Sequence, residues 1–310
     1  MTKTKTAFGW SKLAGFKHLN LGQKKFMLAW LFVAPVLIIR VLTTLYPMLT
    51  AFYYSFLEYD LIRQRREPGG LINFSNLRYN PAFWDSLSFT LIFTVSSVFF
   101  IIVLGTPLAL LLKQNFAGRR LLRTVILIPW GLAAIVISIA GFWIFNDSYG
   151  IVNDMIRRIG FSDFSFAWLA NPTGARVAVI IVNVWRNTPF FAIIMLAAFQ
   201  GVPLELYESA KMDGANALII FFRITMPYVM GTFILVTLFV GIWQINHFEI
   251  VYAMSRGGPG NATSLLAYRI YLEATRTLNF GTASAISVIL FGVTAIYAVL
   301  GLSLYRRIDY

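Results

Sequence analysis

Six long apolar runs divide the chain, and polar segments separate them. A helix needs about 20 mostly apolar residues to cross the hydrocarbon core of a bilayer, and each run reaches that length. The predicted spans are 27–49, 87–112, 124–145, 177–199, 228–252 and 283–305. This pattern predicts an all-α membrane protein with six transmembrane helices.

The composition agrees with a membrane protein and excludes several kinds of site. Hydrophobic residues make up 58% of the chain and charged residues 13%, and the mean hydropathy is +0.70. Soluble domains carry about a quarter charged residues. The chain has no cysteine, which excludes disulfides, zinc–thiolate sites and iron–sulfur clusters. The two histidines, His18 and His247, lie too far apart in the sequence to indicate a metal site.

The distribution of lysine and arginine predicts the orientation in the membrane. With the N-terminus inside, the inner segments hold 14 Lys and Arg in 70 residues, and the outer segments hold 10 in 98. All eight lysines fall in the inner segments. The positive-inside rule therefore predicts that both termini are cytoplasmic. The net charge of +13 is explained in the same way, so nucleic acid is not expected as a partner.

The domain organisation is predicted to be simple. Residues 1–26 form a basic cytoplasmic tail, and residues 27–310 form one six-helix domain. The first apolar run is too long for the core of a signal peptide, so it is expected to remain as a span. No GxxxxGK[ST] phosphate loop is present, so ATP is not expected to bind to this chain.

The inner segment 200–227 has an unusual pattern for a connecting loop. Pro203 is suited to the start of a helix, and Glu205 and Glu208 follow in the first turns, where the helix dipole favours acids. Gly214 ends or bends this helix, and a second helical stretch leads to Pro227. The segment is predicted to be a helix, a turn and another helix on the membrane surface, with small residues exposed to a partner.

This segment resembles the EAA loop of bacterial binding-protein-dependent ABC importer permeases. The family pattern is E-A-A, three residues, Gly, nine residues, then I-x-L-P. Here it is Glu208-Ser209-Ala210, three residues, Gly214, nine residues, then Ile224-Thr225-Met226-Pro227. Ser209 and Met226 are mild departures from the pattern.

Three further stretches extend the resemblance to the carbohydrate-uptake branch of this family. They are Trp185 to Phe190 with Pro189 between them, Gly257-Gly258-Pro259 followed by Thr263, and Gly150-Ile-Val-Asn153. The resemblance implies the type I ABC importer permease fold, in its minimal six-helix form, in the bacterial cytoplasmic (inner) membrane.

The resemblance also implies partners and a set of coupling residues. In the family the loop is a coupling helix that docks on an ATPase subunit. The residues implied here are Glu208, Ser209, Ala210, Asp213, Gly214 and Pro227. The implied partners are a second homologous permease, two ATPase subunits that bind ATP and Mg, and a periplasmic or lipid-anchored solute-binding protein. This chain itself is expected to be non-catalytic and to hold no cofactor.

Polar side chains within spans indicate a candidate path for a substrate, because they are costly in a membrane and usually functional. An aromatic ring and hydrogen-bonding groups recur with the spacing i, i+1, i+4 on the fourth and fifth spans. The six residues are Arg186, Asn187, Phe190, Trp243, Gln244 and His247. Rings pack on apolar sugar faces while amides and charges bind hydroxyls. Aligned without a gap from the EAA loop, these six fall on positions that contact sugar in the carbohydrate branch, although the residue type differs at 186 and 247.

Other interpretations remain open at this stage. Arg186 would also be satisfied by reaching the outer interface or a backbone carbonyl, and Gln244 and His247 by hydrogen bonds between helices. Arg40 in the first span and Arg186 together would suit an acidic sugar, such as a uronate oligomer or a sugar phosphate. A permease for a non-sugar solute, a channel, a secondary transporter or a membrane enzyme would explain fewer of these features.

Overall fold

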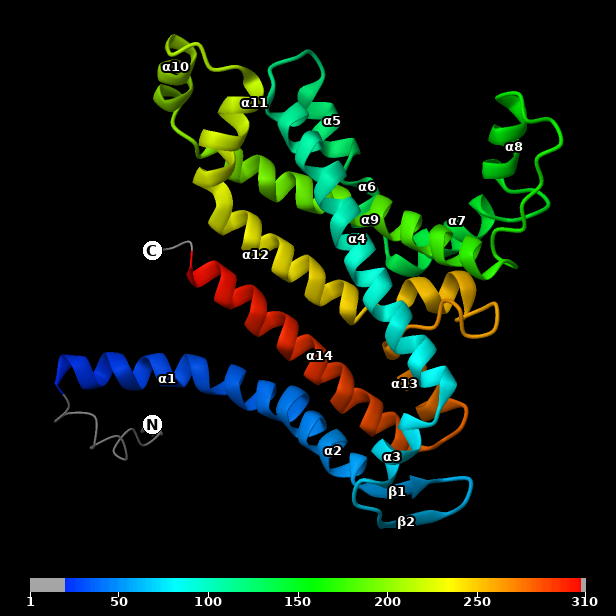
Figure 1. Cartoon of the computed structure of the whole chain (residues 1–310). Helices are drawn as coiled ribbons and strands as arrows, with labels where there is room; N and C mark the ends of the chain where they lie inside the picture. The colour runs from blue at the N-terminus through cyan, green and yellow to red at the C-terminus, as the bar shows by residue number, and fades with distance from the viewer. Residues whose placement is uncertain (1–19, 308–310) are drawn as a thin grey trace, which may run out of the picture. The chain divides into compact units, whose positions relative to one another are not determined.

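The computed structural model describes residues 20–307, which are mostly helical (Figure 1). The chain divides between Tyr53 and Tyr54 into two units. The predicted boundary at residue 26 falls inside the first helix, and most of the predicted N-terminal tail lies outside the described residues.

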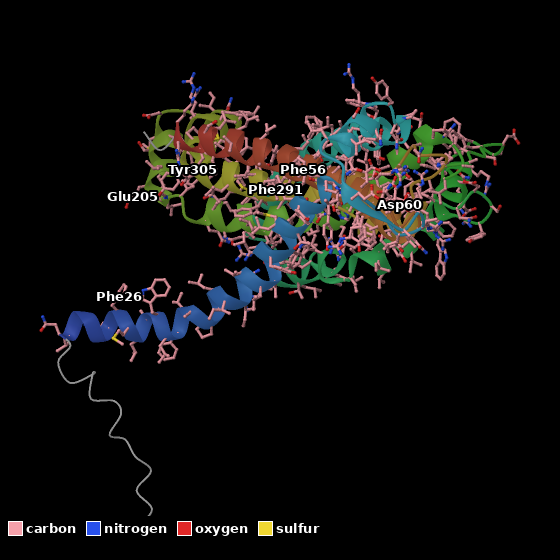
Figure 2. The ribbon with its side chains drawn as sticks, turned by 90° about the horizontal axis from the view of Figure 1, so that it is seen from below. Phe26, Phe56, Asp60, Glu205, Phe291 and Tyr305 are labelled. Atoms are coloured by element: carbon pink, nitrogen blue, oxygen red, sulfur yellow. The ribbon has the colours of Figure 1, made fainter. Side chains whose placement is uncertain are left out.

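The first unit is an apolar helix with no buried face. It comprises α1 (Leu21–Arg40), a π-helical turn η2 (Val41–Leu45) and α2 (Tyr46–Ser55), whose last two residues belong to the second unit. Residues Lys25–Ser55 contain a window of mean hydropathy 2.2, of which none is buried, and Phe26 stands clear of the helix (Figure 2). A helix that is apolar on every side is stable only in lipid or against a partner.

The second unit contains the remaining helices. They are α3 (Ile72–Arg78), α4 (Pro81–Lys113), α5 (Arg119–Val125), α6 (Ile128–Gly131), α7 (Ala134–Ile144), α8 (Ile151–Arg158), α9 (Pro172–Gln200), α10 (Leu204–Met212), α11 (Ala217–Ile220), η3 (Phe221–Thr225), α12 (Met226–Ile245), η4 (Val251–Ser255), α13 (Leu266–Thr275) and α14 (Phe280–Arg306). Across residues 20–307, five helices are long and apolar enough to span a membrane, or up to six if one bent pair counts as a span. The predicted spans 27–49, 87–112, 177–199 and 283–305 lie within four of these helices.

The long helices begin where the sequence supplies a cap. The side-chain oxygen of Asn80 accepts hydrogen bonds from the first turn of α4, and that of Asn171 does the same for α9. In both cases proline follows the cap, where its missing N–H has no cost. Each cap of this kind is worth about 1 kcal/mol.

The third predicted span, 124–145, is not one helix. Helical segments Arg119–Gly131 and Ala134–Ile144 meet at an angle of 90°. Pro129 lies in the first turn of α6, and Leu132 has the extended ψ of 148°, which ends the helical path. Proline and glycine break the ladder of backbone hydrogen bonds here, so the apolar run turns instead of continuing.

The fifth predicted span, 228–252, has different ends in the structure. The helix begins at Ala217, runs through Pro227 and ends at Ile245, with Asn246 as its C-cap. A π-turn, η3, comes just before Met226-Pro227, as η2 comes just before Tyr46-Pro47. Because proline crowds the carbonyl four residues earlier, a wide turn at that point lets the helix pass through it.

A β-hairpin corrects the all-α prediction. Strands β1 (Leu57–Asp60) and β2 (Arg65–Pro68) pair antiparallel, and the backbone N–H of Leu61 donates to the carbonyl of Leu278 next to α14. The turn is stabilised by Asp60, whose side chain accepts from the N–H of Arg63 at 2.9 Å. Asp60 on the hairpin and Glu205 on α10 lie at opposite ends of the second unit (Figures 1 and 2).

The core of the second unit forms where α4 packs along α9. Gly105 on α4 lies so close to Phe191 on α9 that a Cβ there would be 2.5 Å from the ring. Phe191 and Ile101 are fully buried at this contact. Between helices in lipid, close packing of this kind replaces the hydrophobic effect as the source of association.

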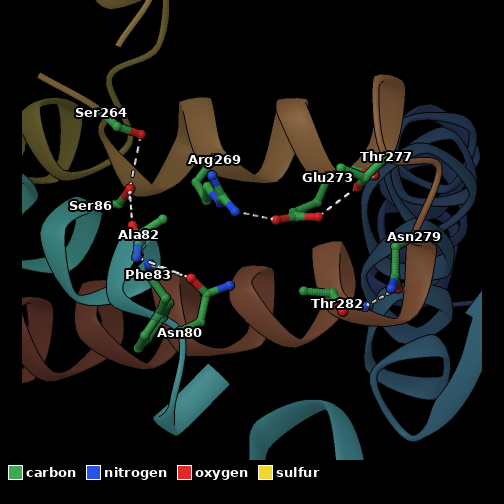
Figure 3. A network of polar contacts seen from close by, with 10 residues as sticks. All are labelled: Asn80, Ala82, Phe83, Ser86, Ser264, Arg269, Glu273, Thr277, Asn279 and Thr282. Carbon is green, nitrogen blue, oxygen red and sulfur yellow. Dashed lines mark hydrogen bonds and ion pairs between the residues drawn. The ribbon is translucent and has the colours of Figure 1, made fainter. Parts of the chain in front are cut away.

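Buried polar contacts hold the end of the unit that carries the hairpin (Figure 3). Ser86 on α4 donates to Ser264 at 2.9 Å. On α13, Glu273 is 6% exposed, pairs with Arg269 at 2.7 Å and accepts from Thr277 at 2.6 Å. A buried carboxylate is tolerated because it is both paired and hydrogen-bonded. These contacts tie the segment before α13 to α4 and stabilise the C-terminal end of α13.

Candidate functional site

Asn183 on α9 lies at the centre of a hydrogen-bond network that joins three helices. Its Nδ2 donates to Ser97 Oγ on α4 at 2.9 Å and to Gln244 Oε1 on α12 at 2.7 Å. Its backbone carbonyl and Oδ1 accept from Asn187 Nδ2 at 2.8 and 2.9 Å. All four side chains are buried. Interhelical hydrogen bonds in membranes contribute about 0.6 kcal/mol on average, so this network orders the three helices more than it stabilises them.

Several polar atoms around this network are buried without a hydrogen-bond partner in the described part of the chain. They are Gln244 Nε2, Arg186 Nε and His247 Nδ1. The Arg186 guanidinium makes one long contact, 3.4 Å from Nη1 to Asn187 Oδ1. An unsatisfied buried donor costs about 1–3 kcal/mol, so such groups usually mark a place where water or a ligand binds.

A stack of aromatic rings lies beside the network. Phe190 on α9 stacks on Trp130 of α6, with centroids 4.8 Å apart and planes at 18°, and its centroid is 5.1 Å from that of Trp243 on α12. Positions 183, 187 and 190 follow the i, i+4, i+7 spacing of one helix face, so rings and amides lie on the same side of α9. Trp243 is 46% exposed and is therefore accessible.

The predicted common face for Trp243, Gln244 and His247 is wrong at His247, because α12 ends at Ile245. His247 lies beyond the helix end, buried edge-on against Phe93 with centroids 5.8 Å apart. Its Nδ1 is 3.7 Å from Glu249 Oε2, and Glu249 also acts electrostatically on Arg186. Gln244 accepts a hydrogen bond from Asn183 on α9, so the alternative interpretation of Gln244, a hydrogen bond between helices, holds. Its Nε2 has no hydrogen-bond partner among the described residues.

The inner loop forms α10 and a glycine turn. Pro203, which was predicted to start the helix, is instead the N-cap residue just before it, with a ψ of 138°. Gly214 has φ +75°, and the N–H groups of Gly214 and Ala215 donate to the carbonyls of Lys211 and Ala210. This is the Schellman ending, in which glycine adopts the left-handed conformation without strain. The second helical stretch of the loop is continuous with α12 and does not lie as a separate helix.

The predicted coupling residues lie on α10, in the turn that follows it and, for Pro227, in the first turn of α12. Glu208, Ser209, Asp213 and Gly214 are exposed, and Ala210 is buried against the body of the unit. Leu204 and Met212 are also exposed, at 69% and 87%. The outward face thus exposes large apolar side chains beside the acids, and exposed apolar side chains that gather on one face indicate a contact surface.

A groove of about 1040 Å³ lies on another side of α9. Its walls come from α4, α5, α6 and α9, and apolar side chains such as Phe100 and Trp185 dominate them. None of the six predicted path residues lines it. The network and the ring stack are therefore separate from this groove.

Sequence reasoning did not find Ser97, Asn183 and Trp130. Asn183 precedes Asn187 by four residues, so the helical spacing of two amides within one apolar run was an available signal. Trp130 gave no signal of its own, because its position depends on the bend after α6. Among the described residues, no group of three or more His, Cys, Asp or Glu could hold a metal ion. The arrangement can bind and orient a polar ligand.

Comparison with known proteins gives a consistent result. Residues 101–310 match the family described as binding-protein-dependent transport system inner membrane component. The chain is 33% identical to the sulfoquinovosyl glycerol transport system permease protein of Agrobacterium fabrum, over 91% of this chain and 92% of that protein. It is 32% identical to the trehalose/maltose transport system permease protein of Thermococcus litoralis, over 93% and 96% of the two chains.

The fold also matches a solved transporter structure. A bacterial ABC transporter involved in the import of the acidic polysaccharide alginate gives a TM-score of 0.79, with 22% identity over 93% of this chain and 98% of that chain. At this identity the likeness establishes the fold.

Proposed function

Because this chain belongs to the family of binding-protein-dependent transport system inner membrane components, we propose that it forms half of the path by which an ABC importer carries a carbohydrate across the bacterial cytoplasmic membrane. The observation that carries the proposal is the ring stack of Trp130, Phe190 and Trp243 beside the network centred on Asn183. Aromatic faces pack on the apolar face of a sugar, and amides with an unused donor bind its hydroxyls. The names of two relatives, which refer to sulfoquinovosyl glycerol and to trehalose/maltose, support the same class of substrate.

The chain works as one part of a larger assembly. It pairs with a second permease, two ATPase subunits that bind ATP and Mg, and a solute-binding protein in the periplasm or on a lipid anchor. A neighbour in fold, a bacterial alginate ABC transporter in complex with an alginate pentasaccharide-bound periplasmic protein, supports the last of these partners. With six spans and both termini in the cytoplasm, α10 lies on the ATPase side and the hairpin on the outer side.

The exposed face of α10 is the coupling surface. Glu208, Ser209 and Asp213 meet a cleft on the ATPase, Ala210 packs inward, and Gly214 and Pro227 set the path of the chain into α12. ATP-driven closure of the two ATPases moves this helix, and the permease changes between inward- and outward-facing packings as a rigid-body transition.

The substrate carries a negative charge, such as that of a uronate oligomer or a sugar phosphate. Within the described residues, Arg186 forms no ion pair within 4.0 Å, so Glu249 compensates it only from farther away, and its buried Nε has no hydrogen-bond partner. A cation inside a membrane site is costly unless an anion or several dipoles compensate it. Arg186, Asn187 and His247 would bind an acidic group while the rings hold the sugar.

Competition during uptake tests the proposal. The assembled transporter takes up a labelled oligouronate in the presence of unlabelled acidic or neutral oligosaccharides of equal length. We expect uptake of the label, strong competition by the acidic compounds and weak competition by the neutral ones. Equal competition would contradict the charge preference, and absence of uptake of any carbohydrate would contradict the substrate class.

A further inference from the structure

Tyr207 joins α10 to two other helices. It is half-buried, and its hydroxyl accepts a hydrogen bond from Lys113 Nζ at 2.8 Å. The same ammonium lies 4.2 Å from the centroid of the Tyr207 ring. The hydroxyl also lies 3.2 Å from Thr225 Oγ1. Since it accepts from lysine, its own hydrogen is free to be donated to Thr225.

The two partners of Tyr207 lie at the ends of helices that line the candidate site. Lys113 is the last residue of α4, the helix that carries Ser97 of the network. Thr225, which is buried, immediately precedes α12, the helix that carries Trp243 and Gln244. At a rise of about 1.5 Å per residue, the length of helix between the partner of Tyr207 and the network residue is roughly 25 Å on both α4 and α12.

Other side chains of α10 form no comparable link. Among residues 20–307, the side-chain hydrogen bonds from α10 to another helix are those of Tyr207. Ala210 completes the inward face by packing alone. Lys113 has no acidic partner within 4.0 Å in the described chain, so its contact with the phenol and the ring is its main compensation.

We infer that Tyr207 is a positioning residue that makes α10 move together with the ends of α4 and α12. Without its hydroxyl, α10 would still fold and dock, because the exposed face is unchanged. When α10 moves, however, the helices that carry Ser97 and Gln244 would follow it over a shorter distance. This inference rests on the proposed function, since it assigns a role within ATP-driven import.

The test is Tyr207→Phe in the complete transporter, reconstituted with its ATPases and binding protein. This change removes both hydrogen bonds and keeps the ring. Tyr228→Phe on α12 is the matched control, since Tyr228 is 54% exposed and forms no side-chain hydrogen bond among the described residues. The readout is the amount of solute imported per ATP hydrolysed, a ratio that a loss of stability alone does not change.

We expect Tyr207→Phe to lower this ratio about fivefold, the change that corresponds to the roughly 1 kcal/mol of a typical hydrogen bond. Tyr228→Phe leaves it unchanged. Lys113→Met lowers the ratio similarly, and the double variant is no worse than either single one, because both changes break one link. A wild-type ratio in Tyr207→Phe, or multiplying effects in the double variant, would overturn the inference.

Assembly is measured in parallel by co-purification of the ATPases. If Tyr207→Phe reduces the yield of complex, the ratio is measured on the complex that remains, and an unchanged ratio there overturns the inference. Failure of the inference leaves ATP-dependent uptake by the wild type intact. If the wild type shows no such uptake, the proposed function fails, and the inference falls with it.

Discussion

At the scale of residues, the candidate site combines two kinds of contact that the chain builds from separate helices. The amides of α9 and α12 are hydrogen-bonded to one another through Asn183, but Nε2 of Gln244 has no partner among the described residues. The rings of Trp130, Phe190 and Trp243 come from three elements and meet beside them. A ligand that offers hydroxyls on its edge and an apolar face can use both.

Replacement of Trp130 by alanine tests the ring stack. Loss of one ring from a stacked pair costs about 1 kcal/mol, so the rate of uptake at saturating binding protein should fall about fivefold. Trp143→Ala on α7 is the control, since Trp143 is 62% exposed and forms no ring contact among the described residues. Equal rates in the two variants would remove Trp130 from the path.

The geometry of the site could be predicted from the sequence where helical spacing alone decides it. Asn187 and Phe190 share a face of α9 as their spacing requires. The prediction failed at His247, because Asn246 ends α12 and no periodicity in the apolar run marks that ending. Trp130 was missed because its approach to Phe190 depends on the 90° bend between α6 and α7, which is a tertiary feature.

At the scale of elements, prolines and glycines decide how the apolar runs become helices. Two runs pass through Pro47 and Pro227 as continuous helices with a π-turn before each proline, whereas α4 and α9 pass through Pro107 and Pro189 without one. The run after Pro129 bends instead. The runs themselves could be predicted from hydropathy, whereas the response to a proline depends on the neighbouring turn and packing. The hairpin was missed for a similar reason, because its contact with Leu278 lies far away in sequence.

The turn after α10 allows a matched test. Gly214 and Gly118 both have positive φ, +75° and +85°, and both have open space where a Cβ would stand. Alanine at either position should therefore cost about 1–2 kcal/mol from backbone strain alone. Melting experiments should give similar losses for the two variants.

Only Gly214→Ala should also reduce uptake per ATP, because only this turn holds the coupling surface. Equal coupling in Gly214→Ala and Gly118→Ala would mean that the turn serves stability and not coupling.

At the scale of the whole molecule, two surfaces are left uncovered by the described residues of the chain. The first unit is an apolar helix with no buried face, and the outward side of α10 exposes Leu204 and Met212 together with acids. Composition predicted the apolar first span. The loop was predicted to expose small residues, whereas the structure exposes Leu204 and Met212 there and buries Ala210. The geometry that connects α10 to the site through Tyr207 required the structure.

The most direct measurement of the central claim is uptake by the reconstituted transporter with Glu208→Arg on α10. Charge reversal at a docking surface should reduce ATP-dependent uptake and solute-stimulated ATP hydrolysis by about tenfold or more. Glu67→Arg on the hairpin, an exposed glutamate without an ion pair among the described residues, should keep both activities if the hairpin plays no part in coupling. Wild-type uptake and hydrolysis in Glu208→Arg would contradict the account of this chain as a permease driven through α10.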